Sequence, residues 1–154
     1  MKIYTVDEAK LRLEAYCAYQ ERCHKEVTNK LRQMGMIPLA VDAIVAHLIE
    51  HNFLNETRFA KSFARGKFRQ KKWGKNRIRQ ELKWREISAV NIRLALSEID
   101  EAEYNETFHA LAEKRASQIL ETNTLKAKKK LADYLLYRGW ESQWVYEKIA
   151  DLYD

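Results

Sequence analysis

The chain has 154 residues, of which 46% are hydrophobic and 32% are charged, and its formal net charge is +6. This length suits one ordinary domain, and the apolar fraction is high enough to bury a core, which argues against a disordered chain. Four Gly and one Pro are too few for the hairpins of a β-sandwich, while strong helix formers are abundant. We therefore expect an all-α protein.

Apolar stretches and cysteines indicate the compartment. Residues 1–10 mix charged and apolar side chains, so we expect no signal peptide. The most apolar segment, residues 37–49, contains an acid and a histidine and is shorter than a membrane span. Cys17 and Cys23 do not have the spacing of a redox pair, and two thiols make no disulfide framework. These features predict a cytoplasmic protein without a membrane segment, whose cysteines are reduced.

Three predicted helices share one kind of start signal. The first follows Thr5, because Thr5 and Glu8 have the spacing of a capping box, and runs to about Arg22. Two others begin near Asn55 and Asp100, each with aromatic residues at helical spacing.

Each of these helices precedes a segment that repeats along the chain. Residues 27–48, 78–99 and 131–152 can be superposed so that their apolar positions coincide. Every copy has an apolar pair four residues apart, a tight turn and a new helix start, which indicates two helices around a turn.

The repeats predict three three-helix units, at residues 1–53, 54–99 and 100–154. Stacked short units of this kind form an elongated, curved helical rod. Gly35 and Gly139 occupy the turns of the first and third copies, where a left-handed residue closes a helix without steric cost. Glu86 stands there in the second copy, and the same geometry would cost it about 1 kcal/mol.

The most informative feature is the distribution of charge. Residues 58–85, the basic stretch, contain twelve Lys or Arg residues and one acid, Glu81, while the rest of the chain is net negative. Because almost no acid lies within the stretch, we expect its cations to lack acidic partners and to attract a polyanion or an acidic protein face. The alternative is an ordinary solvated face.

Candidate contact residues follow from helix faces. In the helix from about Lys75, Ile78 and Leu82 face the core, so the intervening cations point away from it. Trp73 offers stacking on a base or partner, with core packing as its alternative. The residues that we predict to bind a partner or nucleic acid are Arg65, Arg69, Lys71, Lys72, Trp73, Lys75, Arg77, Arg79, Lys83 and Arg85.

A secondary basic patch is predicted in the run near residue 128. Its position at a helix start opposes the helix macrodipole. A secondary contact patch and an ordinary solvated face are the two interpretations of this run. The patch consists of Lys126, Lys128, Lys129 and Lys130.

One motif in the basic stretch resembles a known family. The run LNETRFA at residues 54–60, followed by Phe63, Arg65, Trp73-Gly74, the run RIRQEL at residues 77–82 and Ile87, is similar to the central signature of the RecX regulatory proteins. Two departures are Arg85-Glu86, where a Lys-Gly or similar turn is usual, and Asn55-Glu56-Thr57, where the family commonly has an Asp.

The resemblance implies a function and a set of partners. Members of the family bind the groove of the RecA recombinase filament and suppress its growth, its ATP hydrolysis and strand exchange, and many bind DNA. They are not known as enzymes, and the resemblance implies no cofactor or metal. We expect a monomer that binds RecA filaments and binds single- or double-stranded DNA without sequence specificity.

Two alternatives have their own signals. A helical DNA-binding module acting without a recombinase would use the same cations. His47, Glu50 and His51 match the His-x-x-Glu-His pattern of zinc peptidases, although ordinary helix surface explains them equally well.

Overall fold

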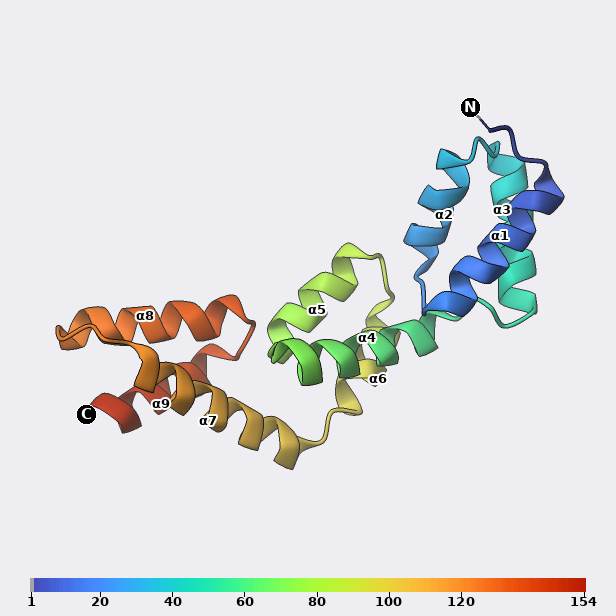
Figure 1. Cartoon of the computed structure of the whole chain (residues 1–154). Coiled ribbons are helices and arrows are strands. Elements are labelled where there is room, and N and C mark those ends of the chain that lie inside the picture. The colour runs from blue at the N-terminus through green and yellow to red at the C-terminus, as the bar shows by residue number, and fades with distance from the viewer. Residues whose placement is uncertain (1) are drawn as a thin grey trace.

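The computed structural model describes residues 2–154, and in this range it contains nine α-helices and no strand. The helices are α1 Val6–Tyr19, α2 His24–Gln33, α3 Pro38–Glu50, α4 Glu56–Lys71, α5 Lys75–Trp84, α6 Ala89–Ser97, α7 Glu101–Gln118, α8 Thr124–Tyr137 and α9 Ser142–Tyr153. They follow one another along an elongated, bent molecule with the termini at opposite ends (Figure 1). The prediction of an all-α rod of helical repeats is confirmed. Within the described range, no helix is both long and apolar enough to cross a bilayer.

The predicted helix starts are confirmed. Thr5 and Glu8 form a capping box on α1, and the side chains of Asn55 and Asp100 accept backbone hydrogen bonds at the starts of α4 and α7. The prediction that the first helix reaches about Arg22 is wrong, because α1 ends at Tyr19. Gln20 is extended there, and Arg22 instead donates from Nε to the Tyr16 carbonyl at 3.1 Å.

The three turns adopt one conformation. Gly35, Glu86 and Gly139 have φ of 82°, 62° and 92°, and each donates its N–H to the carbonyl three residues before it. The next residue donates to the carbonyl five residues before it, which is the Schellman pattern of a helix end. Glu86 therefore keeps the repeat geometry in spite of its side chain.

The buried side chains form two clusters. One is formed by residues of α1–α3 together with Leu54, which follows α3. The other is shared by helices α4–α9 and also receives Cys23 from the chain before α2. Both cysteines are free and buried. The second and third predicted units thus have a common core, and the boundaries at residues 53 and 99 stay predictions.

Candidate partner-binding surface

Helix α5 separates an apolar face from a cationic one. Ile78 and Leu82 are fully buried, so they fix the rotation of the helix against the core. Lys75, Arg79 and Lys83 follow one another at four-residue spacing on another side. A rise of about 1.5 Å per residue places successive members of this row about 6 Å apart along the axis.

The cationic row is one wall of a groove of about 470 Å³ between α5 and α6, here called the α5–α6 groove. Arg93 of α6 also lines it, and Ala89, Ile92 and Leu96 give it an apolar lining. None of its four cations has a carboxylate oxygen within 4.0 Å among residues 2–154. The groove therefore combines four unneutralised positive charges with aliphatic side chains.

Sequence reasoning missed Arg93. It lies outside the basic stretch, in a helix whose composition is mainly apolar. The available signal was its spacing, because Ala89, Arg93 and Ser97 are four residues apart and share a face of α6.

The expectation that the basic stretch lacks acidic partners is wrong for four of its twelve cations. Acids from outside the stretch reach three of them, and Glu81 within the stretch reaches the fourth. Arg65 has no such pair but lines a small pocket beside Glu98 and Glu103, so its surroundings are also acidic. The four ion pairs are Arg58–Glu21, Lys61–Glu98 at 3.2 Å, Arg69–Glu103 at 3.3 Å and Arg85–Glu81 at 3.5 Å.

Trp73 and Arg77 lie together beside the third unit. The Arg77 guanidinium stacks between the rings of Trp73, at 4.2 Å, and Tyr137, at 4.7 Å, and donates to the Tyr137 carbonyl at 3.3 Å. Only 9% of Trp73 is exposed, so the structure gives its indole a packing role. Direct contact of Trp73 with a ligand stays a prediction.

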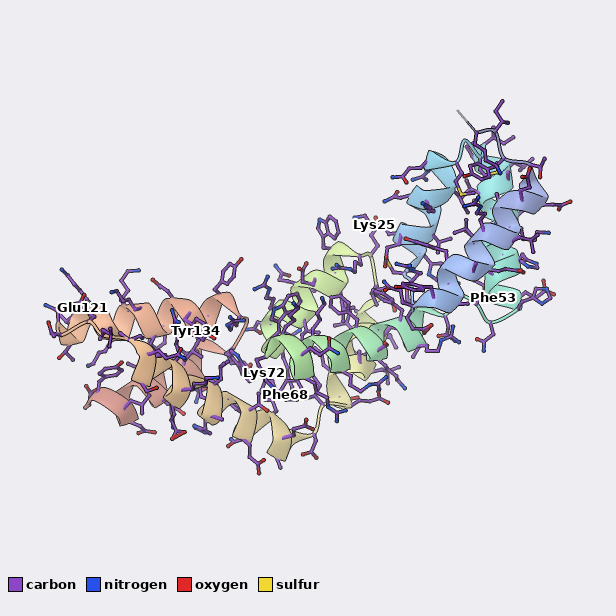
Figure 2. All side chains as sticks on the ribbon, in the orientation of Figure 1. Lys25, Phe53, Phe68, Lys72, Glu121 and Tyr134 are labelled. Atoms are coloured by element: carbon purple, nitrogen blue, oxygen red, sulfur yellow. The ribbon has the colours of Figure 1, made fainter. Side chains whose placement is uncertain are left out.

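Lys71 and Lys72 are exposed at the end of α4, where the chain turns toward the third unit. Figure 2 shows Lys72 close to this boundary. Their carbonyls accept hydrogen bonds from Arg138 Nη1, at 3.3 Å, and Trp140 Nε1, at 3.1 Å. Their backbone joins the units, while their ammonium groups stay outside the α5–α6 groove.

The secondary basic patch is largely neutralised by neighbouring acids. Three of its lysines form ion pairs, and exposed Lys126 has none among the described residues. A patch of this kind produces a weaker field than the α5–α6 groove, and its role in binding stays a prediction. The pairs are Lys128–Asp154 at 2.6 Å, Lys129–Asp133 at 2.7 Å and Lys130–Glu121 at 3.5 Å.

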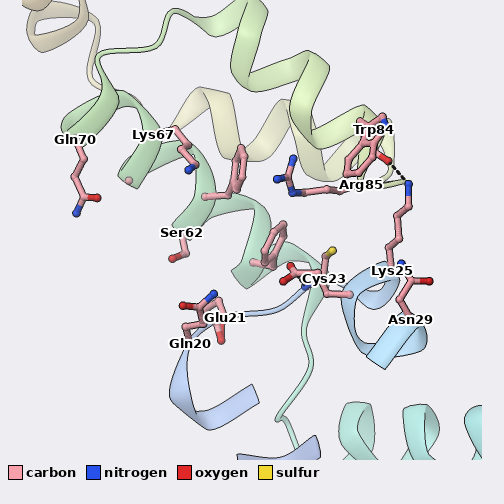
Figure 3. A pocket seen from close by; sticks show the side chains of 14 residues that line it. Gln20, Glu21, Cys23, Lys25, Asn29, Ser62, Lys67, Gln70, Trp84 and Arg85 are labelled. Atoms are coloured by element: carbon pink, nitrogen blue, oxygen red, sulfur yellow. Dashed lines mark hydrogen bonds between the residues drawn. The ribbon is translucent and has the colours of Figure 1, made fainter. Parts of the chain in front are cut away.

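A second cavity, of about 620 Å³, separates the first unit from α4 and the end of α5 (Figure 3). Lys25 crosses its edge, with Nζ donating to the Trp84 carbonyl at 2.9 Å and lying 4.0 Å from the Trp84 ring. Trp84 is 65% exposed. The lining carries both acids, such as Glu21, and cations, such as Lys67, so it has no single charge sign.

The rings of His47, in α3, and His51, the residue that caps its C-terminal end, have centroids 4.4 Å apart. His47 Nε2 lies 2.6 Å from a carboxylate oxygen of Glu14 on α1, which links the two helices. Across residues 2–154, no group of three His, Cys, Asp or Glu is arranged to hold a metal ion. The zinc alternative thus gains no support from the arrangement of these side chains.

Comparison with known proteins gives consistent matches. A model of the second three-helix domain of RecX matches residues 55–96, and a model of the third matches residues 101–149. The regulatory protein RecX of Pseudomonas savastanoi pv. phaseolicola is 32% identical, over 80% of this chain and 77% of its own length. The regulatory protein RecX of Lactobacillus johnsonii is 29% identical over 84% of this chain, which spans only 48% of that longer protein.

Solved structures agree with the fold. The crystal structure of RecX from Lactobacillus salivarius superposes with a TM-score of 0.80 at 24% identity, and 96% of each chain is covered. A second crystal structure, of a regulatory protein RecX, gives a TM-score of 0.83 at 25% identity over 95% of this chain and 73% of that one. The repeat architecture, the signature around the basic stretch and these matches together show that the chain belongs to the RecX family of regulatory proteins.

Proposed function

We propose that this protein binds the RecA recombinase and its nucleoprotein filament and inhibits filament extension, ATP hydrolysis and strand exchange. Membership of the RecX regulatory family supports the choice of partner. An elongated, bent molecule with a cationic groove on its middle unit suits a spiral surface formed by acidic protein and phosphate groups. The observation that carries the proposal is the α5–α6 groove, whose four cations lack carboxylate partners.

The test is a titration of recombinase ATPase on single-stranded DNA. Wild-type protein is expected to suppress the ATPase, and a variant without the groove cations is expected to need at least about tenfold more protein. Inhibition by this variant at wild-type concentrations would contradict a role for the groove. The variant combines Lys75→Ala, Arg79→Ala, Lys83→Ala and Arg93→Ala.

A matched control removes four cations elsewhere. Each control residue is a Lys or Arg outside the predicted binding residues and without a carboxylate partner within the described range. This control has the same net charge as the groove variant, and it is expected to retain inhibition. The control substitutions are Arg12→Ala, Lys30→Ala, Arg32→Ala and Lys114→Ala.

The second candidate function is direct DNA binding without a recombinase. The cations in the α5–α6 groove favour it, because unneutralised Lys and Arg also bind phosphates. Affinity for DNA would fall steeply with salt, with a log-log slope near the number of phosphates contacted. If filament inhibition persists at salt concentrations that abolish DNA binding, the inhibition depends on protein contacts. DNA binding is then an accessory activity. We propose that the protein acts as a cytoplasmic monomer.

A further inference from the structure

The lining of the α5–α6 groove is complementary to a ligand with two chemical properties. Its cations need anionic groups, because four positive charges share a small space without a carboxylate. Its aliphatic side chains need apolar contact, since uncovered apolar surface gains free energy when a partner removes it from water. A ligand that supplies only charge would leave the aliphatic lining uncovered.

Nucleic acid supplies anionic groups for the cations but does not match the aliphatic lining. Phosphates would pair with the cations, but bases bind proteins chiefly by stacking on aromatic side chains. No aromatic residue lines the α5–α6 groove within the described part of the chain. The aromatic rings of this region are elsewhere: Trp73 is buried, and Trp84 lines the other cavity.

The spacing of the cations matches another helix. Lys75 and Lys83 are eight residues apart on α5, which corresponds to roughly 12 Å along its axis. A helix with Asp or Glu at every third or fourth position repeats its charges at nearly the same interval. An apolar stripe beside those acids would meet Ala89, Ile92 and Leu96.

We propose that the α5–α6 groove is the docking site for an acidic, amphipathic helix of a partner protein. The helix lies along the groove with its acids toward the cations of α5 and toward Arg93, and with its apolar stripe toward α6. The inference rests on the proposed function only for the identity of the protein that carries the helix. The geometry itself requires no recombinase.

The experiment uses the full chain and a fluorescein-labelled synthetic helical peptide. One stripe of the peptide carries Glu at every third or fourth position, and the neighbouring stripe carries Leu. Fluorescence anisotropy should show saturable binding. Replacing each Glu by Gln, or each Leu by Ser, should weaken binding at least about tenfold. Unchanged affinity after the Leu replacement would overturn the inference, because the groove would then recognise charge alone.

Charge exchange locates the site. The double variant Arg79→Glu, Arg93→Glu should bind the Glu peptide at least about tenfold more weakly than the wild type. The control Arg32→Glu, Lys114→Glu has the same net charge, and its affinity for the peptide should stay within about twofold of the wild-type value. The double groove variant should in turn bind a peptide that carries Lys in place of Glu more tightly than the wild type does. Circular dichroism checks that both variants stay helical. Equal losses in the two double variants would overturn the inference.

Nucleic acid provides the last comparison. Unlabelled oligo-dT should displace the Glu peptide only at phosphate concentrations well above the peptide carboxylate concentration. Displacement at equal charge would show a general polyanion surface and overturn the inference. Filament ATPase inhibition tests the proposed function separately. If the wild-type protein inhibits the ATPase and the groove variant does not, but the wild-type protein binds no peptide, only the helix-docking inference falls.

Discussion

The junction between the second and third units includes direct backbone–backbone hydrogen bonds as well as side-chain contacts, whereas the contacts of the first unit with α4 and α5 are made by side chains. At the former, the Gly74 N–H donates to the Arg138 carbonyl at 2.8 Å, and the Asn76 N–H donates to the Gly139 carbonyl at 3.0 Å. A continuous core lies beneath these bonds. Backbone contacts of this kind leave little freedom for one unit to rotate against the other.

The first junction is more open. Lys25 bonds to the Trp84 carbonyl, Arg58 forms an ion pair with Glu21, and a cavity of about 620 Å³ lies between the units. Cys23 is the one described residue of the first unit that joins the shared core. Partly exposed side-chain contacts contribute little to stability. We therefore expect the second and third units to behave as one rigid body, and the first unit to separate from them more easily.

Gly139→Ala should cause the largest loss in stability, because Gly139 lies where the backbones of the second and third units are in contact. A Cβ on Gly139 would lie 2.3 Å from both Cβ and N of Arg77, and φ at this position is 92°. Relief would require the second and third units to move apart. We expect a loss of at least about 3 kcal/mol in the free energy of unfolding, measured with urea.

Gly35→Ala is the matched control, because Gly35 occupies the equivalent turn with φ of 82° and has no atom within 4 Å of an added Cβ. Only backbone strain acts there, so we expect a loss of about 1 kcal/mol. Equal losses for Gly139→Ala and Gly35→Ala would show that the close approach at the second junction does not matter.

Tyr104→Phe should produce the next largest loss. The Tyr104 hydroxyl accepts from the Lys75 N–H at 2.9 Å and donates to Glu141, so it connects all three residues across the second junction. Burial, together with this carboxylate, raises the pKa of Tyr104 and keeps the hydroxyl protonated. Removing it leaves a backbone donor without its partner, and we expect the free energy of unfolding to fall by about 1–3 kcal/mol.

Tyr137→Phe is the control for Tyr104→Phe, since Tyr137 is 76% exposed and lies near the same junction. Its loss should stay below about 0.5 kcal/mol. If both substitutions cost the same in urea unfolding, the buried hydroxyl network does not hold the junction.

Local signals predicted the helices and turns, but contacts between units required the structure. The cap at Thr5, the turn glycines and the apolar pair Ile78 and Leu82 act within a few residues, so sequence spacing is sufficient to find them. The approach of Gly74 to Gly139 joins segments far apart in the chain, and no local pattern encodes it.

The candidate site was predictable to a similar degree. The α5 row follows from helical spacing, and the sequence therefore indicated Lys75, Arg79 and Lys83. The acids that pair with cations of α4 lie far along the chain from them. Glu98 reaches Lys61, and Glu103 reaches Arg69, only in the folded protein. Local charge counts cannot register such partners.

The cysteines offer a direct test of how readily the first junction opens. Cys17 is buried in the first core, and burial raises its pKa to about 11; burial also raises the pKa of Cys23, at the junction. Near pH 8 both thiols are protonated and enclosed, so labelling requires opening. In single-cysteine variants, we expect Cys23 to react with a thiol reagent at least about tenfold faster than Cys17, after normalisation to rates in urea.

Lys25→Ala should accelerate Cys23 labelling further and leave Cys17 labelling unchanged. Lys25 forms a hydrogen bond across the first junction, and it is not part of the buried cluster of the first unit. Equal labelling of the two cysteines would mean that the first junction opens no more readily than the unit itself.

Glu86→Gly should produce the only gain in the free energy of unfolding. Glu86 has φ of 62° in a turn like that of Gly139, but it is exposed, whereas Gly139 lies against Arg77. Its cost is therefore conformational, and glycine should raise the free energy of unfolding by about 1 kcal/mol. Glu86→Ala, which keeps a Cβ, should give no comparable gain in urea unfolding. A gain shared by both variants would mean that the charge of Glu86, and not its backbone, destabilises the turn.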